Sequence, residues 1–556
     1  MRAWKVALLV TVALAAGFVL GIAEGEIPFT KDDIAGAEKL IALEFTDAER
    51  DSMQGDLADY RKGYEDLRAV PIPNDIPPAL VFNPIPGRPV VAGSAAGRSR
   101  VELGKAPKVK RPANLEDVAF WPVRDLGELL RTKQVTSTEL TQMYIARLKR
   151  YDPKLLCVVT LLEEQALAAA KQADEEIAKG KYRGPLHGIP YGAKDLLAVK
   201  GAKTTWGSMP YKEQTIEQTA TVVQRLDDAG AVLIAKLTLG ELAWGDVWFG
   251  GMTRNPWNLE QGSSGSSAGS ASATSAGCVA FAIGTETWGS IVSPSTRCGV
   301  TGLRPTFGRV SRAGAMALSW SMDKIGPICR TVEDCAIVLD VIKGPDGVDP
   351  AVVDAPFTYS AKTKLSDLKI GYVKSLFDED YPNKANDAAA LEKLRSLGAT
   401  LVPVELPKIP SSSLTCILTA EAAAAFDDLT RSNRDDEMVR QIRNAWPNTF
   451  RAARFIPAVE YIQANRARTL LMREMEKLPV DVYITPAFGG DNLLYTNLTG
   501  HPCVVLPDGF DDKGAPTSIT FMGRLFEEGK VLAVAKAYQD ATDFHKKHPP
   551  MFAAAQ

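Results

Sequence analysis

From Asp125 to the end of the chain, segments with helical periodicity alternate with short apolar runs, and this alternation restricts the fold more than any other feature. Stretches such as "TELTQMYIARLKRY" and "EEQALAAAKQADEEIAKGK" place apolar residues at helical spacing. The runs Val232–Ala235, "CVAFAIGTE" and "VDVYITPAF" are short and apolar, as in strands that are buried on both faces. The sequence therefore predicts an α/β fold in which helices cover a largely buried sheet.

The N-terminal segment has the pattern of a secretory signal peptide. Arg2 and Lys5 precede an uncharged run from Val6 to Ala23, and small residues follow that run. We expect residues 1–25 to be cleaved and the protein to be exported to the periplasm or the extracellular space. An uncleaved membrane anchor is the alternative, because the apolar run approaches spanning length. Contact with a membrane is expected only in that case.

Residues 26–110 differ in pattern from the remainder of the chain. Apolar residues at helical spacing between about Ile27 and Leu67 predict two helices. The following stretch "VPIPNDIPPALVFNPIPGRP" contains too many prolines for a helix or a central strand, and it is either an extended arm or a spacer. We therefore divide the chain into a signal peptide (1–25), an N-terminal helical and Pro-rich arm (26–110) and a main domain (111–556).

Composition excludes several classes of partner and cofactor. The net charge of −3 provides no basic surface, so nucleic acid is not expected as a partner. Seven cysteines are dispersed without a CxxC pair, and the four histidines lack the spacing of a metal-binding helix. We expect no metal and no other cofactor. One or two disulfides are compatible with export, although the sequence does not assign them.

A run from Gly262 to Gly277 contains only glycine, serine, alanine and threonine. Such a composition suits a flexible linker, but this run leads directly into the apolar stretch "CVAFAIGTE" instead of separating two domains. The same small residues suit a helix that is pressed closely against a sheet. In that interpretation Gly265, Ser266 and Ser267 lie at the helix N-terminus, where free backbone N–H groups favour an oxyanion.

Two serines are candidate nucleophiles. Ser267 lies in a GxSxG pattern, but that motif requires a preceding strand, which "NPWNLEQGSS" does not predict, and no acid partner is evident. Ser290 follows an apolar strand on a glycine-containing turn, where successive N–H groups can form an oxyanion hole. Lys194 is a candidate base for Ser290. Lowering a lysine pKa to about 7–8 requires about 4 kcal/mol of desolvation, which an apolar pocket can provide.

Several long motifs resemble the amidase signature family of hydrolases. They are "PLHGIPYGAKDLLAVKGAKTTWGS", "TRNPWNLEQGSSGSSAGSASA", "GTETWGSIVSPSTRCGVTGLRPTFGRVSRAG" and "NLTGHPCVVLPDGF", and the resemblance extends from about Asp125 to the C-terminus. It implies a central mixed β-sheet with helices on both faces and a Ser–cis-Ser–Lys triad. By motif, Lys194 corresponds to the family lysine, Ser266 to the serine after a cis peptide bond, and Ser290 to the nucleophile.

The resemblance also implies the mechanism. Ser290 would attack an amide carbon while its proton passes through Ser266 to the amine of Lys194, and the backbone N–H groups of Thr287, Trp288, Gly289 and Ser290 would bind the oxyanion. Water would then hydrolyse the acyl-enzyme. The expected activity is therefore amide hydrolysis on a small-molecule substrate.

Three residues around the nucleophile depart from the family pattern. Glu286 stands where an aspartate is usual, Trp288 replaces a glycine, and Val292 replaces an arginine. The missing arginine favours a neutral or apolar acyl group over a carboxylate-bearing one.

Aromatic residues between the lysine motif and the Gly/Ser run are candidates for the substrate rim. They are Trp244, Trp248 and Phe249. Each of them is also compatible with a place in the hydrophobic core.

Two alternatives to an exported amidase remain open on the sequence. One is the glutaminase component of a tRNA-dependent amidotransferase, which would have partner subunits and lack a signal peptide. The other is an inactive binding protein on the same scaffold, because the oxyanion loop is altered. The sequence leaves open whether the protein forms a homodimer.

Overall fold

A computed structural model describes residues 27–72, 79–80 and 99–553. The predicted signal peptide, residues 1–25, and most of the Pro-rich stretch lie outside these ranges. Within them, no helix combines the length and the apolar character that crossing a membrane requires.

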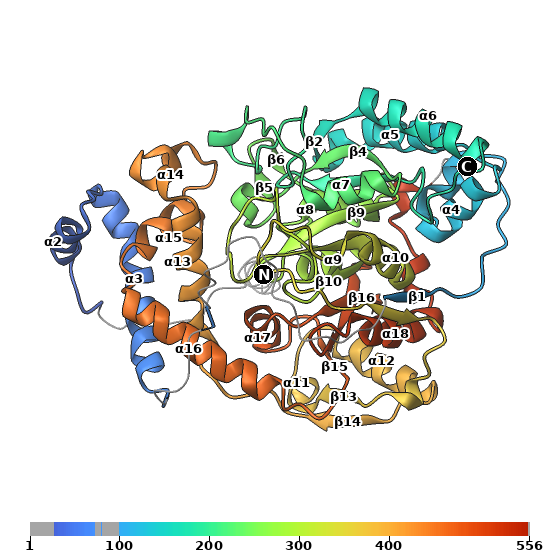
Figure 1. The fold of residues 1–556 in the computed structure, drawn as a ribbon. Coiled ribbons are helices and arrows are strands. Elements are labelled where there is room, and N and C mark those ends of the chain that lie inside the picture. The colour runs from blue at the N-terminus through green and yellow to red at the C-terminus, as the bar shows by residue number, and fades with distance from the viewer. Residues whose placement is uncertain (1–26, 73–78, 81–98, 554–556) are drawn as a thin grey trace, which may run out of the picture.

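Eleven strands form one mixed sheet in the order β14-β13-β15-β17-β16-β10-β11-β9-β3-β4-β2 (Figure 1). Their bounds are β2 (Val158–Leu161), β3 (Pro190–Lys194), β4 (Val232–Leu237), β9 (Phe281–Glu286), β10 (Thr301–Arg304), β11 (Lys324–Cys329), β13 (Ile370–Val373), β14 (Leu401–Val404), β15 (Val482–Pro486), β16 (Cys503–Phe510) and β17 (Pro516–Gly523). Strand β3 runs parallel to both β4 and β9, so the carboxyl ends of these three strands lie at one edge of the sheet. That edge carries Lys194 and Glu286.

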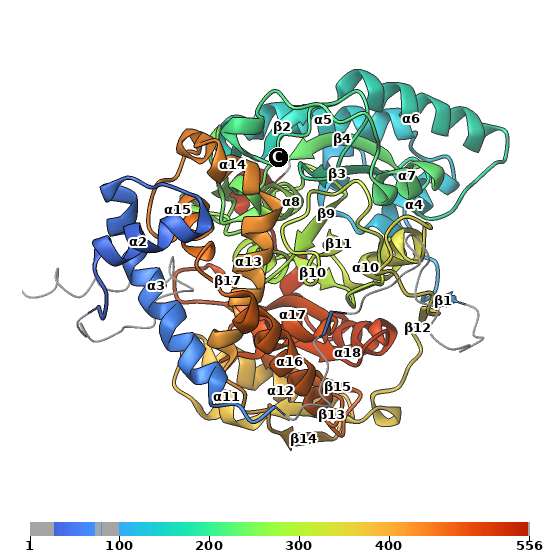
Figure 2. The same ribbon diagram turned by 60° about the vertical axis from the view of Figure 1, so that its left-hand side comes forward.

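Helices cover both faces of the sheet, as predicted. Helices α10 and α18 pack against β11 and β16, and α8 and α9 pack against β9 and β16; Figure 2 shows α10 and α18 on one side of the central strands and α8 on the other. The helices of the main body are α4 (Val123–Arg131), α5 (Ser137–Leu155), α6 (Glu163–Ala178), α7 (Thr221–Asp228), α8 (Ala268–Ser275), α9 (Val292–Cys298), α10 (Val332–Ile342), α11 (Lys374–Asp378), α12 (Lys384–Ser396), α17 (Asn492–Thr499) and α18 (Glu528–Asp540). Their alternation with the strands confirms the α/β prediction.

The two helices expected between Ile27 and Leu67 are present as α2 (Lys31–Ile41) and α3 (Asp47–Arg68). Each begins with a threonine that forms a capping box with an acidic residue three positions later. Helix α3 packs beside α15 and α16 in both ribbon views. This group of helices is completed by segments from the second half of the chain, which are α13 (Cys416–Ala425), α14 (Asp427–Arg431), α15 (Trp446–Ala453) and α16 (Ala458–Met475).

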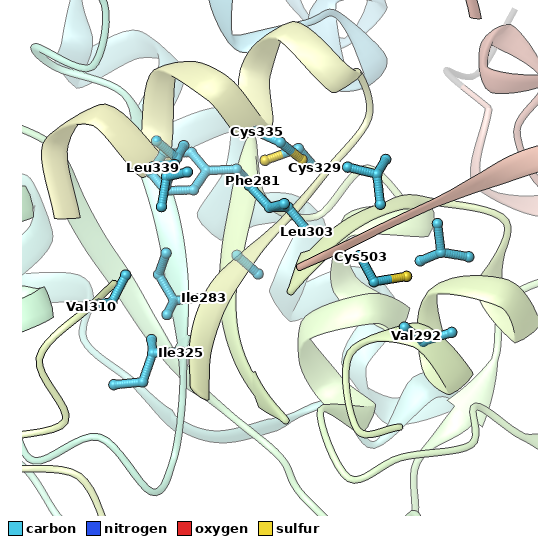
Figure 3. Packing of buried hydrophobic residues seen from close by; sticks show 14 of the residues in the cluster. Phe281, Ile283, Val292, Leu303, Val310, Ile325, Cys329, Cys335, Leu339 and Cys503 are labelled. Carbon is cyan, nitrogen blue, oxygen red and sulfur yellow. The ribbon is translucent and has the colours of Figure 1, made fainter. Parts of the chain in front are cut away.

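The centre of the sheet is packed with apolar side chains from neighbouring strands (Figure 3). Phe281 and Ile283 of β9, Leu303 of β10 and Ile325 of β11 are all buried, and Val292 of α9 packs in the same cluster. This packing fixes β9, whose last residue is Glu286, and therefore the position from which the loop to Ser290 begins.

The Gly/Ser run is a close-packed helix and not a linker. All residues of α8 are buried, and its small side chains allow the helix to lie against the sheet. A Cβ atom on Gly269 would lie 2.5 Å from the carbonyl oxygen of Cys157 and 2.5 Å from the amide nitrogen of Thr238. Only glycine therefore fits at this contact.

We expect Gly269→Ala to destabilise the protein by roughly 1–3 kcal/mol, because the added methyl group would overlap backbone atoms that cannot rotate away. Thermal or urea unfolding measures the change. The matched control is Gly36→Ala in α2, where a Cβ atom would meet no atom within 4 Å. That control should stabilise the helix by about 0.5–1 kcal/mol, and equal effects of the two variants would contradict the packing of α8.

Candidate active site

Lys194 is the last residue of β3, and its side chain is completely buried. Its Nζ lies 2.8 Å from Ser266 Oγ, 2.8 Å from Thr285 Oγ1 and 3.2 Å from Ser267 Oγ. These partners come from β9 and from the loop before α8, so the fold surrounds the amine with hydroxyl groups from segments that are distant in sequence. Lys194 and Ser266, which the sequence analysis selected separately, are in direct contact.

Burial lowers the pKa of Lys194 to about 7, although the carboxylates of Asp323 and Glu286 oppose the shift. An amine with this pKa is largely uncharged at slightly alkaline pH, and its lone pair can accept a proton. The hydroxyl of Ser266 is positioned to deliver that proton.

Ser266 lies in a loop that approaches the neighbouring backbone very closely. It is 1% exposed, and the peptide bond between Gly265 and Ser266 is cis. A Cβ atom on Gly265 would lie 1.8 Å from the carbonyl oxygen of Gly245, so this position admits no side chain. The N–H of Ser264 donates to Asp246 Oδ2 at 2.9 Å, so two adjacent residues, Gly245 and Asp246, hold the loop in place.

Ser290 is next to this loop. The N–H of Ser267 donates to the carbonyl oxygen of Ser290 at 3.1 Å, which joins the two serine-bearing segments through their backbones. Ser290 is 8% exposed, in contrast to the completely buried Lys194. The structure thus brings Lys194, Ser266 and Ser290 to one place, with the serine at 290 nearest to solvent.

The turn before Ser290 has the features of an oxyanion hole. The N–H groups of Gly289 and Ser290 have no acceptor among the residues that the structure describes. Gly289 has φ +86°, so the left-handed conformation of this turn falls on the glycine and Trp288 is not required to adopt it. Trp288 is half-buried against the hydrophobic core.

Glu286 anchors the far side of this turn. Its carboxylate accepts the N–H groups of Ile291 at 2.8 Å and Val292 at 2.9 Å. It also pairs with Arg304 at 2.7 Å, and the side-chain amide of Asn497 donates to it at 2.8 Å. Burial opposes ionisation of Glu286, but these partners outweigh burial and lower its pKa to about 2. The carboxylate is therefore a permanent anion with a complete set of donors.

Ser267 is not an exposed nucleophile. Contrary to expectation, a strand does precede the Gly/Ser run, because β8 (Asn258–Gly262) pairs with β7 (Arg254–Asn255). Ser267 is nevertheless completely buried, and its Oγ donates to the carbonyl oxygen of Thr285 and accepts from the N–H of Thr285. It holds β9 against the start of α8, which excludes the nucleophile-elbow interpretation.

The three aromatic rim candidates lie in different surroundings. Trp244 adjoins Gly245, which touches the Ser266 loop, and its ring lies 4.5 Å from the guanidinium of Arg440. Trp248 is buried and stacks edge-on with Phe249 at 4.7 Å. The ring and hydrogen-bond contacts of Trp248 and Phe249 within the described ranges do not reach the lysine or the two serines. Their role as a rim stays a prediction.

Three other polar residues of the quoted motifs have structural contacts. Asp195, beside Lys194, forms a fully buried ion pair with Lys236 at 2.7 Å. His187 accepts the N–H of Arg183, and His501 pairs with Thr499. All seven cysteines are buried and unpaired, so the disulfides that export allowed are not formed.

Sequence reasoning missed Thr285 and Asp323. Thr285 contacts the amine of Lys194 through its hydroxyl, and Asp323 accepts the hydroxyl of Thr287 at 2.6 Å. Thr285 immediately precedes the predicted oxyanion motif, so its position gave a weak signal. No local pattern marks Asp323, because its importance arises from a contact between separate segments.

The site combines a buried amine, a serine hydroxyl in contact with it, a second serine with a small exposed fraction, and N–H groups without an acceptor among the described residues. This is the arrangement of a hydrolase that works through an acyl-enzyme. Comparison with known proteins agrees with that class. The Amidase family model matches residues 139–494, which is more than half of the chain. The chain therefore belongs to the amidase family, and it is an amide-hydrolysing enzyme.

The names of the relatives and of the structural neighbours indicate more than one activity. The chain is 37% identical over 477 residues to a glutamyl-tRNA(Gln) amidotransferase subunit from Geobacillus thermodenitrificans, and the match covers 77% of this chain and 98% of that protein. It is 35% identical to the protein of the same name from Methylococcus capsulatus, with coverage of 76% and 98%. The peptide amidase of Stenotrophomonas maltophilia has a similar structure, with a TM-score of 0.70 and 31% identity over 79% of this chain and 100% of the other.

We expect the rate of acylation to rise with pH along a limb with a midpoint of about 7. The pKa of Lys194 is lowered by burial, so the proton-accepting form dominates above this pH and is lost below it. Pre-steady-state rates across pH 5 to 9 measure the limb. The control substitution Lys513→Met, at an exposed lysine, should leave the midpoint of this limb unchanged. An acylation rate that does not change over this pH range would contradict the role of Lys194.

Proposed function

We propose that this amidase hydrolyses a carboxylic amide through an acyl-enzyme on Ser290, with Ser266 and Lys194 as the proton relay. The observation that carries the proposal is the 2.8 Å contact between the buried amine of Lys194 and Ser266 Oγ, in a loop that is hydrogen-bonded to Ser290. An uncharged amine in this place has no evident structural purpose, since burying it costs free energy that an apolar side chain would not cost.

The proposed steps balance protons at each stage. Ser290 Oγ forms a bond to the amide carbon while its proton moves to Ser266, whose own proton moves to Lys194 Nζ. The oxyanion is held by the N–H groups of the turn from Thr287 to Ser290. When the C–N bond breaks, the proton returns through Ser266 to the leaving nitrogen, which is a poor leaving group without it. Water then attacks the ester by the same relay and releases the acid.

We expect fluorophosphonate to label Ser290 in the folded protein. The probe needs an activated serine, so Lys194→Ala should slow labelling by roughly 100- to 10,000-fold. Mass spectrometry of the labelled peptide locates the modification, and Ser290→Ala provides the control. Well-folded protein that takes no label would support the alternative of an inactive binding protein, and label on Ser267 would restore the nucleophile elbow.

The substrate that fits this site has a neutral acyl group. Val292 occupies the position where the family resemblance places an arginine, and it is completely buried in the core cluster. It provides no charge for a substrate carboxylate. The two curated relatives described above are instead named as amidotransferase subunits.

A panel of amides tests the substrate class. We expect kcat/KM for neutral primary amides and C-terminal peptide amides to exceed that for glutamine and for acidic amides, because Val292 provides no positive charge that would compensate their carboxylate. Val292→Arg is the informative variant and should raise kcat/KM for acidic amides relative to kcat/KM for neutral amides. A wild-type preference for glutamine would favour the second candidate, the glutaminase component of an amidotransferase.

We also propose that the protein is exported. The uncharged run from Val6 to Ala23 supports this, and a mature chain without residues 1–25 is its consequence. Retention of that segment would instead anchor the enzyme to a membrane. Homodimer formation stays a prediction.

A further inference from the structure

The turn that would bind the oxyanion is held at both ends by carboxylates. Glu286 holds the end near Ile291 and Val292, as described above. At the other end, the hydroxyl of Thr287 donates to Asp323 Oδ1 at 2.6 Å. The two carboxylates come from different segments, and only Glu286 belongs to the strand that leads into the turn.

Asp323 is itself fixed by backbone donors. Its second oxygen, Oδ2, accepts the N–H of Leu318 at 2.8 Å and the N–H of Ser319 at 2.9 Å. The N–H groups of Met322 and Asp323 in turn donate to the carbonyl oxygen of Ser319. The segment 318–323 is therefore a closed turn, and the Asp323 carboxylate has little freedom to move.

Two helices from the second half of the chain, α13 and α16, hold this turn. Glu421 of α13 accepts the hydroxyl of Ser319 at 2.6 Å and both the N–H and the hydroxyl of Ser321, at 3.0 Å and 2.7 Å. Arg468 of α16 donates to the hydroxyl and the carbonyl oxygen of Ser321 at 2.8 Å and 2.7 Å. A continuous series of hydrogen bonds thus connects α13 and α16 with Thr287.

We propose that Asp323 is a positioning residue, which orients the oxyanion turn by holding the side chain of Thr287 on a turn fixed by Glu421. The proposal rests on the proposed function for its effect on rate. Donors to a developing oxyanion are effective only when their directions are set before the reaction, and displacement by about 1 Å can reduce the rate 100-fold.

The charge of Asp323 also reaches the base. Among the charged groups around Lys194, Asp323 and Glu286 both favour its protonated form, against the effect of burial on its pKa. Burial raises the pKa of Asp323 itself, while its bonds from Thr287, Leu318 and Ser319 and the nearby Arg312 favour the ionised form. Removing the Asp323 charge should therefore lower the pKa of Lys194. A residue with only a structural role would not produce that shift.

The test uses Asp323→Asn and Thr287→Val in the full chain, with a neutral amide as substrate. Each variant should lower kcat roughly 10- to 100-fold with little change in KM, because the turn loses its orientation. The double variant should be no slower than the slower single variant, because the two substitutions remove the same contact between Thr287 and Asp323. The acid limb of the pH profile should move to lower pH in Asp323→Asn alone. Exposed Asp512→Asn is the control and should match wild type.

Hydrogen exchange provides a readout that does not depend on activity. Amides in the peptide 284–292 should exchange faster in both variants, while a peptide from α12 should not change. Unchanged exchange together with unchanged kcat would overturn the proposal for Asp323. If the wild-type protein neither takes up the fluorophosphonate label at Ser290 nor hydrolyses amides, the proposed function is wrong. Faster exchange in the two variants would in that case still support the contact between Asp323 and Thr287. If Asp323→Asn fails to fold, Thr287→Val carries the test, because it removes only a hydroxyl group.

Discussion

The burial of one amine organises this active site. Lys194 ends a strand inside the sheet, and its Nζ is enclosed by hydroxyl groups of Ser266, Ser267 and Thr285. A charged ammonium in this position would lose its hydration, so burial itself lowers the pKa of Lys194. In the proposed mechanism this amine is the base, and the hydroxyl groups supply the path for the proton. The small residues of the Gly/Ser run follow from the same constraint, because only they let α8 and its preceding loop come close enough to close the pocket.

The neighbouring carboxylates favour the protonated amine, but burial outweighs them and keeps the pKa of Lys194 at about 7. Glu286 is permanently ionised, but Arg304, Asn497 and two backbone N–H groups compensate its charge. Its longer side chain, in place of the aspartate expected from the family pattern, pairs with Arg304 and still reaches the start of α9. The departure from the family pattern at this position therefore keeps the turn in place instead of disabling it.

The departures at Trp288 and Val292 have different consequences. The positive φ in the turn belongs to Gly289, so the tryptophan changes the surface beside the turn but not its backbone. Val292 is buried under the turn and contributes packing without charge. The site combines the proton-transfer groups of the family with surroundings that lack the usual cation. On the proposed function, the difference from the amidotransferase subunits lies in substrate recognition and not in the chemistry of acyl transfer.

The sequence alone indicated the α/β class, the two N-terminal helices, the close-packed helix α8 and the three residues of the proposed relay, because periodicity and long motifs are local signals. It also indicated the altered turn around Ser290. It did not reveal that Ser267 is buried against Thr285, that β8 precedes the Gly/Ser run, or that the cysteines stay unpaired. Asp323, Glu421 and Arg468 carry no local pattern at all. Their roles depend on hydrogen bonds between residues that are 36 to 147 positions apart, and only the tertiary structure decides which distant donors and acceptors meet.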